Sequence, residues 1–458
     1  MRSASASSSI RFWVRSSLCD APRRMNYGSQ GLRVTGITTR SVVQRRDIQD
    51  MKRMNFCRAI AWLPMFFANL SSLGFADGNC PALCGPTNDE AGSSRTTPKF
   101  QYKSEGIEVP AATADEPKVT AFGPDSINAA RKYLDDGANY WVRERNCVAC
   151  HSTGVYMVER SPLTPWLGMP SEEVLANFVV SIPQQVGKPE MRDGAKFFGA
   201  SIASVWRSSG LAAWDKYVTG KLSDKTDASL RNTLECLADE GFIKTIAQVE
   251  IPYITTDFEL TVQAARAIIT APGWLDGVKD EATLTRIERM KAYLRDHEPI
   301  SDYELALKLQ LASFPLDLVT ETQRQTAISM LWRQQLPDGG WSTRRMSDIM
   351  KWHTKMDPKV VEMIRSEPDA ESPNSDPYMT AFAIVLLREA GISSSDQRIQ
   401  NGIAWLKQNQ RVSGRWWMKS LYRDTQHYST YISTAQALRA LSLCNEIPPI
   451  NSIDQRKE

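Results

Sequence analysis

The stretch Gln335-Leu336-Pro337-Asp338-Gly339-Gly340-Trp341 decides the fold, because it ends an apolar-periodic segment that begins at Thr326. A second segment, beginning at Ile399, ends in a similar way at Gln410-Arg411-Val412-Ser413-Gly414-Arg415-Trp416. Each time a helical pattern is followed by glutamine, a glycine turn and tryptophan. Recurrence of such a unit indicates stacked supersecondary elements within one array.

A second kind of segment alternates with the first along the chain. It opens with a polar helix cap and continues with small residues, and it occurs at 256–267, 375–387 and 430–441. From Pro124 onward nearly every segment has the apolar spacing of an amphipathic helix, and we find no convincing strand alternation. The fold class is therefore all-α. About 330 patterned residues could form two domains or one closed array, and the repeats favour helical hairpins that bury their apolar faces by stacking.

These motifs resemble the repeats of the squalene–hopene cyclase and protein prenyltransferase superfamily, in the Gln335–Trp341 turn and in the alternating Asp-x-x-x-Thr-Ala helices, such as the one at Asp376. The resemblance is strongest over 255–443 and weaker back to about 125. It implies a terpenoid cyclase-like (α/α) toroid over 121–445, with outer and inner helices around a central cavity. It also implies that the glutamine and tryptophan of each motif tie a turn to the next hairpin, so that Trp341 and Trp416 are stacking residues.

The sequence departs from this superfamily at the residues that carry its chemistry. Cyclases protonate their substrate from an Asp-x-Asp-Asp sequence, whereas here Asp135-Asp136 stands alone. Prenyltransferases bind zinc with an aspartate, a cysteine two residues later and a distant histidine. Here Tyr378 occupies the cysteine position after Asp376, although His427 lies roughly where the histidine would be. We therefore expect the scaffold without cyclase or zinc prenyltransferase activity.

The segment Asn146-Cys147-Val148-Ala149-Cys150-His151-Ser152 contains a CxxCH sequence. In an exported protein this spacing is typical of covalent c-type haem attachment. Cys147 and Cys150 would form thioethers to one haem, and His151 would be the proximal iron ligand. The alternatives are a chance meeting of these residues, a disulfide, or half of a metal site.

The motif stands where the first hairpin would carry its glutamine–tryptophan turn, so we expect the haem in an inter-helix loop. His353 and His427 fall in loops at the same end of their hairpins, which places three of the chain's four histidines there. We expect His427 to be the first candidate for the distal iron ligand, because ring closure would bring the last hairpin beside the first, and His353 to be the second. Met169, Met346 and Met350 remain possible distal ligands, whereas Met157 lies too close to His151 in sequence to reach the opposite haem face. His297 has the pattern of a solvated helix end.

The N-terminal part of the chain has the composition of a leader. Residues 1–50 contain nine Arg and no Lys, and we interpret them as a mis-annotated extension. Residues 51–76, starting near Met51, combine a basic head, an apolar run and a Gly-Phe-Ala cleavage site, as in a secretory signal peptide. The apolar run is too short and interrupted to span a bilayer, and no later stretch is suitable. Residues 77–120, with Cys80 and Cys84, are expected to form a linker or flexible arm, and 446–458 a C-terminal tail.

The charge balance depends on this trimming. Twelve of the 55 Lys and Arg and three of the 52 Asp and Glu precede Asp77, so the remainder carries 43 basic and 49 acidic residues, a formal net charge of −6. This balance gives no indication of nucleic-acid binding.

Together these observations predict a periplasmic or secreted monohaem c-type cytochrome that transfers electrons to or from a redox partner protein. One alternative is a haem-dependent oxidoreductase acting on an apolar small molecule in the toroid cavity. Another is a non-catalytic ligand-binding protein.

Overall fold

A computed structural model describes residues 99–146, 148–180, 190–192, 195–197, 199–245, 256–346, 362, 365–419 and 427–450. All of them belong to one compact unit, Phe75–Glu458. The predicted extension 1–50, the signal peptide 51–76, Cys80, Cys84, Cys147, Met350 and His353 lie outside the described residues.

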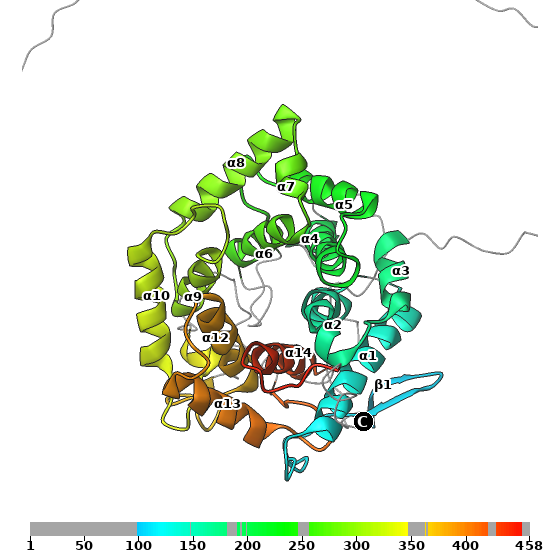
Figure 1. Ribbon diagram of the computed structural model, residues 1–458, viewed down its shortest axis with the longest axis vertical. Coiled ribbons are helices and arrows are strands. Elements are labelled where there is room, and N and C mark those ends of the chain that lie inside the picture. Colours follow the sequence, from blue (N-terminus) through cyan, green and yellow to red (C-terminus); the bar gives the residue numbers. More distant parts are fainter. Residues whose placement is uncertain are drawn as a thin grey trace, which may run out of the picture. The chain divides into compact units, whose positions relative to one another are not determined.

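The described chain is mostly helical, as predicted, and its helices lie in two concentric rings (Figure 1). The outer ring contains α1 (Pro124–Arg145), α3 (Glu172–Val180), α5 (Asp224–Glu235), α8 (Glu281–Asp296), α10 (Glu321–Gln334) and α13 (Gln397–Asn409). The inner ring contains α4 (Gly199–Trp214), α6 (Asp257–Thr270), α9 (Asp302–Leu311), α12 (Pro377–Glu389) and α14 (Tyr428–Leu443), and also a run of short turns. These turns are η1 (Cys150–Gly154), η2 (Tyr156–Arg160), η3 (Ser161–Leu163) and α2 (Thr164–Leu167); α7 (Trp274–Gly277), η4 (Asp215–Thr219) and η5 (Thr343–Arg345) connect other elements.

The inner ring closes through direct contacts. Along the chain α4 packs on α6, α6 on α9, α9 on α12 and α12 on α14. The circuit is completed because α14 and α4 both contact η1 and η2. The Tyr431 hydroxyl on α14 also donates a hydrogen bond to the Leu134 carbonyl on α1, at 2.7 Å. The last helix of the chain therefore packs beside the first.

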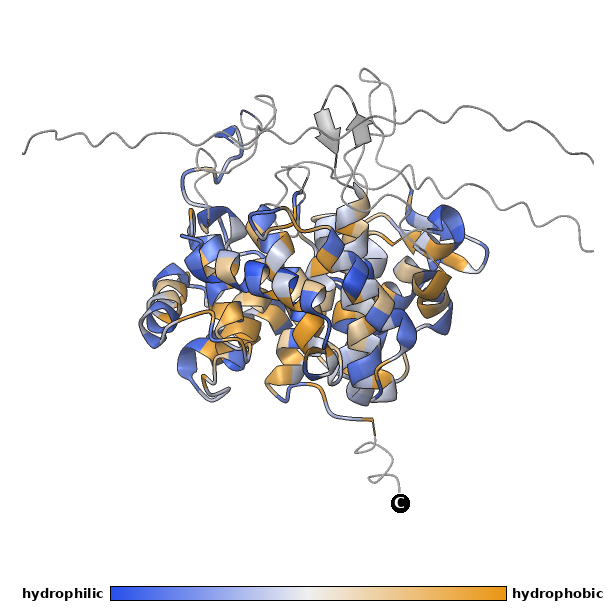
Figure 2. Ribbon diagram, turned by 90° about the horizontal axis from the view of Figure 1, so that it is seen from above, coloured by the Kyte–Doolittle hydropathy of each residue, from blue (hydrophilic) through white to orange (hydrophobic). Residues whose placement is uncertain are grey.

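Burial differs between the two rings. The inner helix α12 is buried along its whole length from Pro377 to Leu387, whereas the outer helix α8 buries one stripe, formed by Thr283, Ile287, Met290 and Leu294. Hydrophilic and hydrophobic residues alternate along the helices in the view from above (Figure 2). An outer helix needs one apolar stripe, but an inner helix needs neighbours all around it.

The two glutamine–tryptophan turns have the same structure. The indole nitrogens of Trp341 and Trp416 donate to the carbonyls of Leu331 and Leu406, at 2.7 and 2.8 Å, in the preceding outer helix. Their backbone N–H groups donate to Thr380 and Thr434 of the next inner helix, at 2.9 and 3.1 Å.

The glutamine side chains connect each turn to the following hairpin by hydrogen bonds. Gln335 donates to the Arg398 carbonyl at 2.8 Å, and Gln410 to the Ser126 carbonyl at 2.9 Å. The expected tie from each turn to the next hairpin is confirmed for the glutamines, and for Gln410 the next hairpin is the first of the chain. The hydrogen bonds of the tryptophans join the two helices of their own hairpin.

Two short antiparallel hairpins were not expected. They are β1 (Phe100–Ser104) with β2 (Ile107–Pro110), and β3 (Glu190–Arg192) with β4 (Ala195–Phe197). The first lies within the predicted linker or flexible arm, yet Tyr102 is buried among the rings of Tyr133, Tyr140 and Tyr431. Strands of three to five residues offer too few alternations to be recognised in a sequence.

Within the described part of the chain, no helix combines the length and apolar character needed to cross a membrane.

Gly414 gives a test of the ring-closing turn. Its φ is +86°, and an added Cβ would lie 2.2 Å from the backbone nitrogen of Ala130 on α1. Gly391 has φ +84° with open space around it, so it is a matched control. We expect Gly391→Ala to lower the free energy of unfolding by about 1 kcal/mol, through backbone strain alone. Gly414→Ala should cost at least about 3 kcal/mol, because strain and overlap add. Urea unfolding checks this, and equal losses would contradict the tight contact.

Candidate functional site

The CxxCH segment leaves the outer ring at the end of α1 and enters the inner ring. Asn146 ends α1 with a left-handed backbone, φ 48°, and its side chain accepts a hydrogen bond from Asn177 at 2.8 Å. Asparagine tolerates this conformation better than most residues. The chain then folds into η1, in which the Gly154 N–H and the Thr153 hydroxyl bond to the backbone of Ala149, at 2.8 and 2.9 Å. η1 packs against α1, α4 and α14, so it lies where the first and last hairpins meet.

His151 is buried at this junction, with 7% of its surface exposed. Its ring stacks on Tyr428 of α14, at 3.7 Å between centroids and 7° between planes, and lies 5.1 Å from the ring of Trp141. Neither imidazole nitrogen has a hydrogen-bond partner among the described residues. A buried polar atom left unpaired costs about 1–3 kcal/mol, and several other described residues, such as Ser229 and Ser342, also contain one. The His151 nitrogens therefore mark a place where a ligand atom would be stabilising.

The surroundings of His151 are apolar and aromatic. Cys150, Val148 and Ala149 are almost fully buried, and Trp141 forms part of the wall. Trp141 Nε1 is likewise a buried atom without a hydrogen-bond partner in the described part of the chain. A Cβ added to Gly154 would contact Trp206 of α4 at 3.0 Å, so this glycine permits close packing of the segment on the inner ring.

Ring closure also brings His427 to this place. His427 is the N-cap of α14, is buried, and directly precedes the Tyr428 ring that stacks on His151. The predicted approach of the last hairpin to the first is thus confirmed by the stacking of His151 on Tyr428. The gathering of the three histidines stays a prediction, because His353 lies outside the described residues.

Among the other methionines considered as iron ligands, Met157 is buried in η2, next to η1, and Met350 lies outside the described residues. The remaining ones lie elsewhere or are exposed. Met346 accepts a hydrogen bond from the backbone of Tyr303 at the start of α9, and Met169 is 56% exposed. His297 was expected to be solvated, and this expectation is wrong. It is partly buried, stacks on Phe258 at 4.2 Å and contacts Glu304 at 2.8 Å. The neighbouring Arg295, Asp296 and Glu298 are exposed, and only the His297 ring turns toward α6 and α9, which the local sequence does not reveal.

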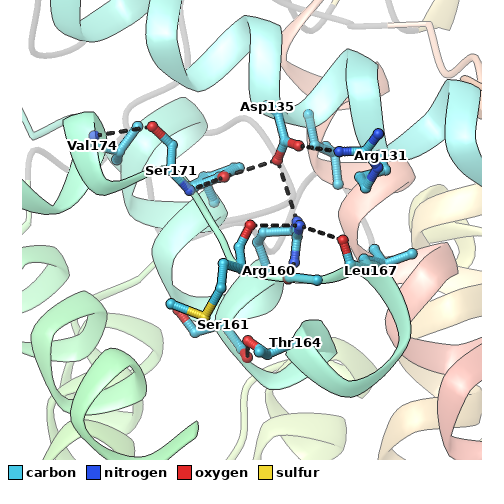
Figure 3. A network of polar contacts seen from close by, with 12 residues as sticks. Arg131, Asp135, Arg160, Ser161, Thr164, Leu167, Ser171 and Val174 are labelled. Carbon is cyan, nitrogen blue, oxygen red and sulfur yellow. Dashed lines mark hydrogen bonds and ion pairs between the residues drawn. The ribbon is translucent and has the colours of Figure 1, made fainter. Parts of the chain in front are cut away.

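A buried polar network fastens the segment after His151 to α1 (Figure 3). Arg160 is fully buried, pairs with Asp135 at 3.3 Å, and donates to the carbonyls of Leu167, Gly168 and Met169 at 2.8 to 3.3 Å. The Tyr156 hydroxyl donates to the same Asp135 carboxylate at 2.8 Å and accepts from the Ser171 N–H at 2.8 Å. Burial and the nearby Asp135 raise the pKa of Tyr156, so that it stays a neutral donor.

The neighbouring Glu159 fastens the same segment in another direction. It is buried and pairs with Arg266 of α6 at 2.9 Å. Two consecutive residues of η2 therefore connect to an outer and an inner helix. Our sequence reasoning missed both, because a Glu-Arg pair of this kind has no distinguishing local pattern; it treated Asp135 only as part of an absent acid motif.

The structure assigns Asp376 a role in helix capping. It caps α12, accepting hydrogen bonds from the Met379 N–H at 2.8 Å and from the Thr343 backbone and hydroxyl. Burial raises the pKa of Asp376 to about 6, although these hydrogen bonds oppose the shift. Among the described residues, no group of three or more His, Cys, Asp and Glu side chains is arranged to hold a metal ion.

Asp135 and Asp136 provide a matched test of the network. Asp135→Asn would leave the buried Arg160 guanidinium without its counter-charge, which should lower the free energy of unfolding by about 3 kcal/mol. Asp136 pairs with the exposed Lys132, so Asp136→Asn should change it by less than about 1 kcal/mol. Urea unfolding of both variants measures the difference. Equal effects would show that Asp135 is not the partner on which Arg160 depends.

Comparison with known proteins adds a likeness in structure alone. No protein-family model matches the chain, and no curated protein matches it. Among solved structures, the apo form of the type II terpene cyclase MstE from Scytonema is similar to it with a TM-score of 0.39 and 13% sequence identity. That similarity covers 71% of this chain and 97% of the cyclase chain.

Proposed function

We propose that the protein is an exported monohaem c-type cytochrome built on a terpenoid cyclase-like (α/α) toroid, and that it transfers electrons. The observation that carries the proposal is the buried His151 imidazole, with neither nitrogen hydrogen-bonded within the described chain, directly after Cys150 of a CxxCH sequence. Chance meetings of these residue types, or a disulfide, would not require that histidine to be buried without a hydrogen-bond partner.

The residue types of the CxxCH segment are those that hold a covalently bound haem. Cys147 and Cys150 would hold it by thioethers, and His151 would ligate its iron. When bound, the group supplies one-electron oxidation and reduction. The chain's own contribution is to orient His151 by stacking on Tyr428 and to exclude water with Trp141, Val148 and Ala149. An apolar shell of this kind raises the reduction potential, because it destabilises the more highly charged oxidised state.

The ligand at the second axial position of the iron distinguishes a protein that transfers electrons from one that catalyses a reaction. A protein ligand on both sides of the iron suits electron transfer, whereas an open position suits oxidation of a substrate. Burial of His427 beside Tyr428 supports His427 as the distal ligand. His353, the second candidate, lies outside the described residues.

Export and partner follow from the same proposal. The signal-peptide pattern near Met51 would deliver the chain to the periplasm or outside the cell, where thioether attachment of haem takes place. A monohaem protein that carries single electrons requires a redox partner protein on at least one side of the transfer.

Haem attachment can be tested by exporting the full chain from a bacterium equipped with c-type maturation enzymes. We expect purified protein to keep its haem after denaturation and to give a pyridine haemochrome spectrum of a thioether-linked haem. The double substitution Cys147→Ala/Cys150→Ala should abolish this covalent haem, and Cys236→Ala, at a buried cysteine of another helix, should not. Exported wild-type protein without covalent haem would overturn the proposal.

The distal ligand has a separate test. His427→Asn removes the imidazole, while asparagine tolerates the left-handed backbone of this position, φ 51°. We expect the optical spectrum to change from low spin to high spin. His297→Asn is the control and should remain low spin. If the His427 variant keeps a low-spin spectrum, His427 is not the ligand, and a high-spin wild type would favour a haem enzyme over an electron carrier.

A further inference from the structure

Several large apolar side chains are exposed at the end of the rings where the chain passes from an inner helix to the next outer helix. Among the described residues, the exposed large apolar side chains are Met169, Val180, Tyr217, Leu222, Leu284, Val412 and Ile450. Four of these belong to the turns that follow α2, α4 and α14, namely Met169, Tyr217, Leu222 and Ile450. Single exposed apolar residues are ordinary, but a group of them in one region often marks an interaction surface.

The three turns neighbour one another. In the inner ring, α2 lies between α4 and α14 (Figure 1). The turn η4, which continues α4, contacts η3, which leads into α2. After α14, the Ile450 N–H donates a hydrogen bond to the Pro165 carbonyl of α2 at 3.0 Å. The four exposed apolar side chains therefore lie in one sector of this end of the rings, and we call this sector the end surface.

The end surface is also basic. The exposed residues from 216 to 225 include three lysines and one carboxylate: Lys216, Lys221, Lys225 and Asp224. The turn after α2 has no charged residue from 164 to 171, and after α14 the carboxylate of Glu446 pairs with Lys407. Residues 77–458 as a whole carry 43 basic and 49 acidic residues, so the positive charge of the end surface is a local feature.

Exposed apolar side chains beside lysines match the two layers of a membrane interface. Apolar side chains are stabilised at the boundary between headgroups and acyl chains, while lysines stay at the level of the lipid phosphates. Tyr217 and the partly buried Trp166 have amphipathic rings of the kind that lie at headgroup level. The exposed side chains stand on three separate turns, so a fluid surface can adapt to them better than the rigid groove of a protein partner.

We propose that the end surface binds peripherally to a membrane that contains anionic phospholipids. Met169, Leu222 and Ile450 enter the interfacial layer, and the three lysines contact the lipid phosphates. The inference goes beyond the proposed electron transfer and does not depend on haem, because none of these residues belongs to the CxxCH segment or contacts His151.

Flotation of the purified full chain with lipid vesicles tests this surface. One set of vesicles contains equal parts of phosphatidylcholine and phosphatidylglycerol, and the other contains phosphatidylcholine alone. We expect the chain to float with the anionic vesicles and to bind the neutral ones at least about tenfold more weakly, because the lysines lose their counter-charges. Added salt should release the chain from the anionic vesicles.

The apolar contribution has a matched pair of variants. Met169 and Val412 are both 56% exposed, but Val412 lies in a glutamine–tryptophan turn, at the other end of the rings. Met169→Ser should weaken binding to anionic vesicles several-fold, and Val412→Ser should leave it unchanged.

The lysines are tested in the same way. Lys216→Gln/Lys221→Gln should weaken binding to anionic vesicles roughly tenfold or more. Lys99→Gln/Lys103→Gln removes the same charge from exposed positions at the β1–β2 hairpin and should not weaken it. All the substituted side chains are exposed, so the variants keep the fold.

The proposal is overturned if wild type binds neither kind of vesicle, if it binds both kinds equally, or if both members of a matched pair lose affinity alike. Size-exclusion chromatography of the same samples identifies a competing occupant. Dimerisation of wild type that Met169→Ser abolishes, without flotation, would assign the end surface to a second copy of the chain. Haem content is measured separately in each preparation, so failure of haem attachment and failure of membrane binding are distinguished.

Discussion

The structure depends on the need of its inner helices for neighbours on every side. A helix such as α12, buried along its whole length, cannot be stable at the end of a row. An open array would need polar capping repeats, whereas a closed ring removes both ends. The contacts of α14 with α1 and η1, and the hydrogen bonds from Gln410 and Tyr431 to the first hairpin, meet this need. The tryptophan turns set the position of the inner helices relative to the outer ones, because each turn ties an outer helix to the inner helix that follows.

The candidate site lies where the ring closes, between the first and last hairpins. In the other hairpins that the structure describes, a long inner helix follows the outer one, but after α1 the chain forms the short turns η1 to η3 and α2. π-Helical turns such as η1 and η2 are uncommon and often accompany functional sites. Here His151 and Cys150 are buried within the irregular backbone of η1. The ion pairs that Arg160 forms with α1 and Glu159 forms with α6 hold those turns in place.

The sequence predicted correctly those features of the structure that are caused by a local pattern of residues. The turns at Trp341 and Trp416 were predicted because glycine, glutamine and tryptophan recur at matching positions, and closure placed His427 near His151. It failed where partners come from distant segments. Arg160 has no local signal for its burial, and nothing in the sequence near Glu159 indicates that it will pair with Arg266 of α6. The β1–β2 hairpin was missed because Tyr102, which anchors it, finds its partners on α1 and α14.

Closure of the ring, by the contact between α14 and α1, also constrains the order of folding. The stacking of Tyr428 on His151 and the Gln410–Ser126 hydrogen bond connect positions far apart in sequence, whereas each hairpin pairs helices close together. Closing a long loop has an entropic cost, and contacts of high sequence separation form slowly. The hairpins can therefore assemble one after another, with the meeting of α14 and α1 as the last event. The surroundings of His151 would then be absent from every partly folded chain, and any group bound there would stabilise only the completed ring.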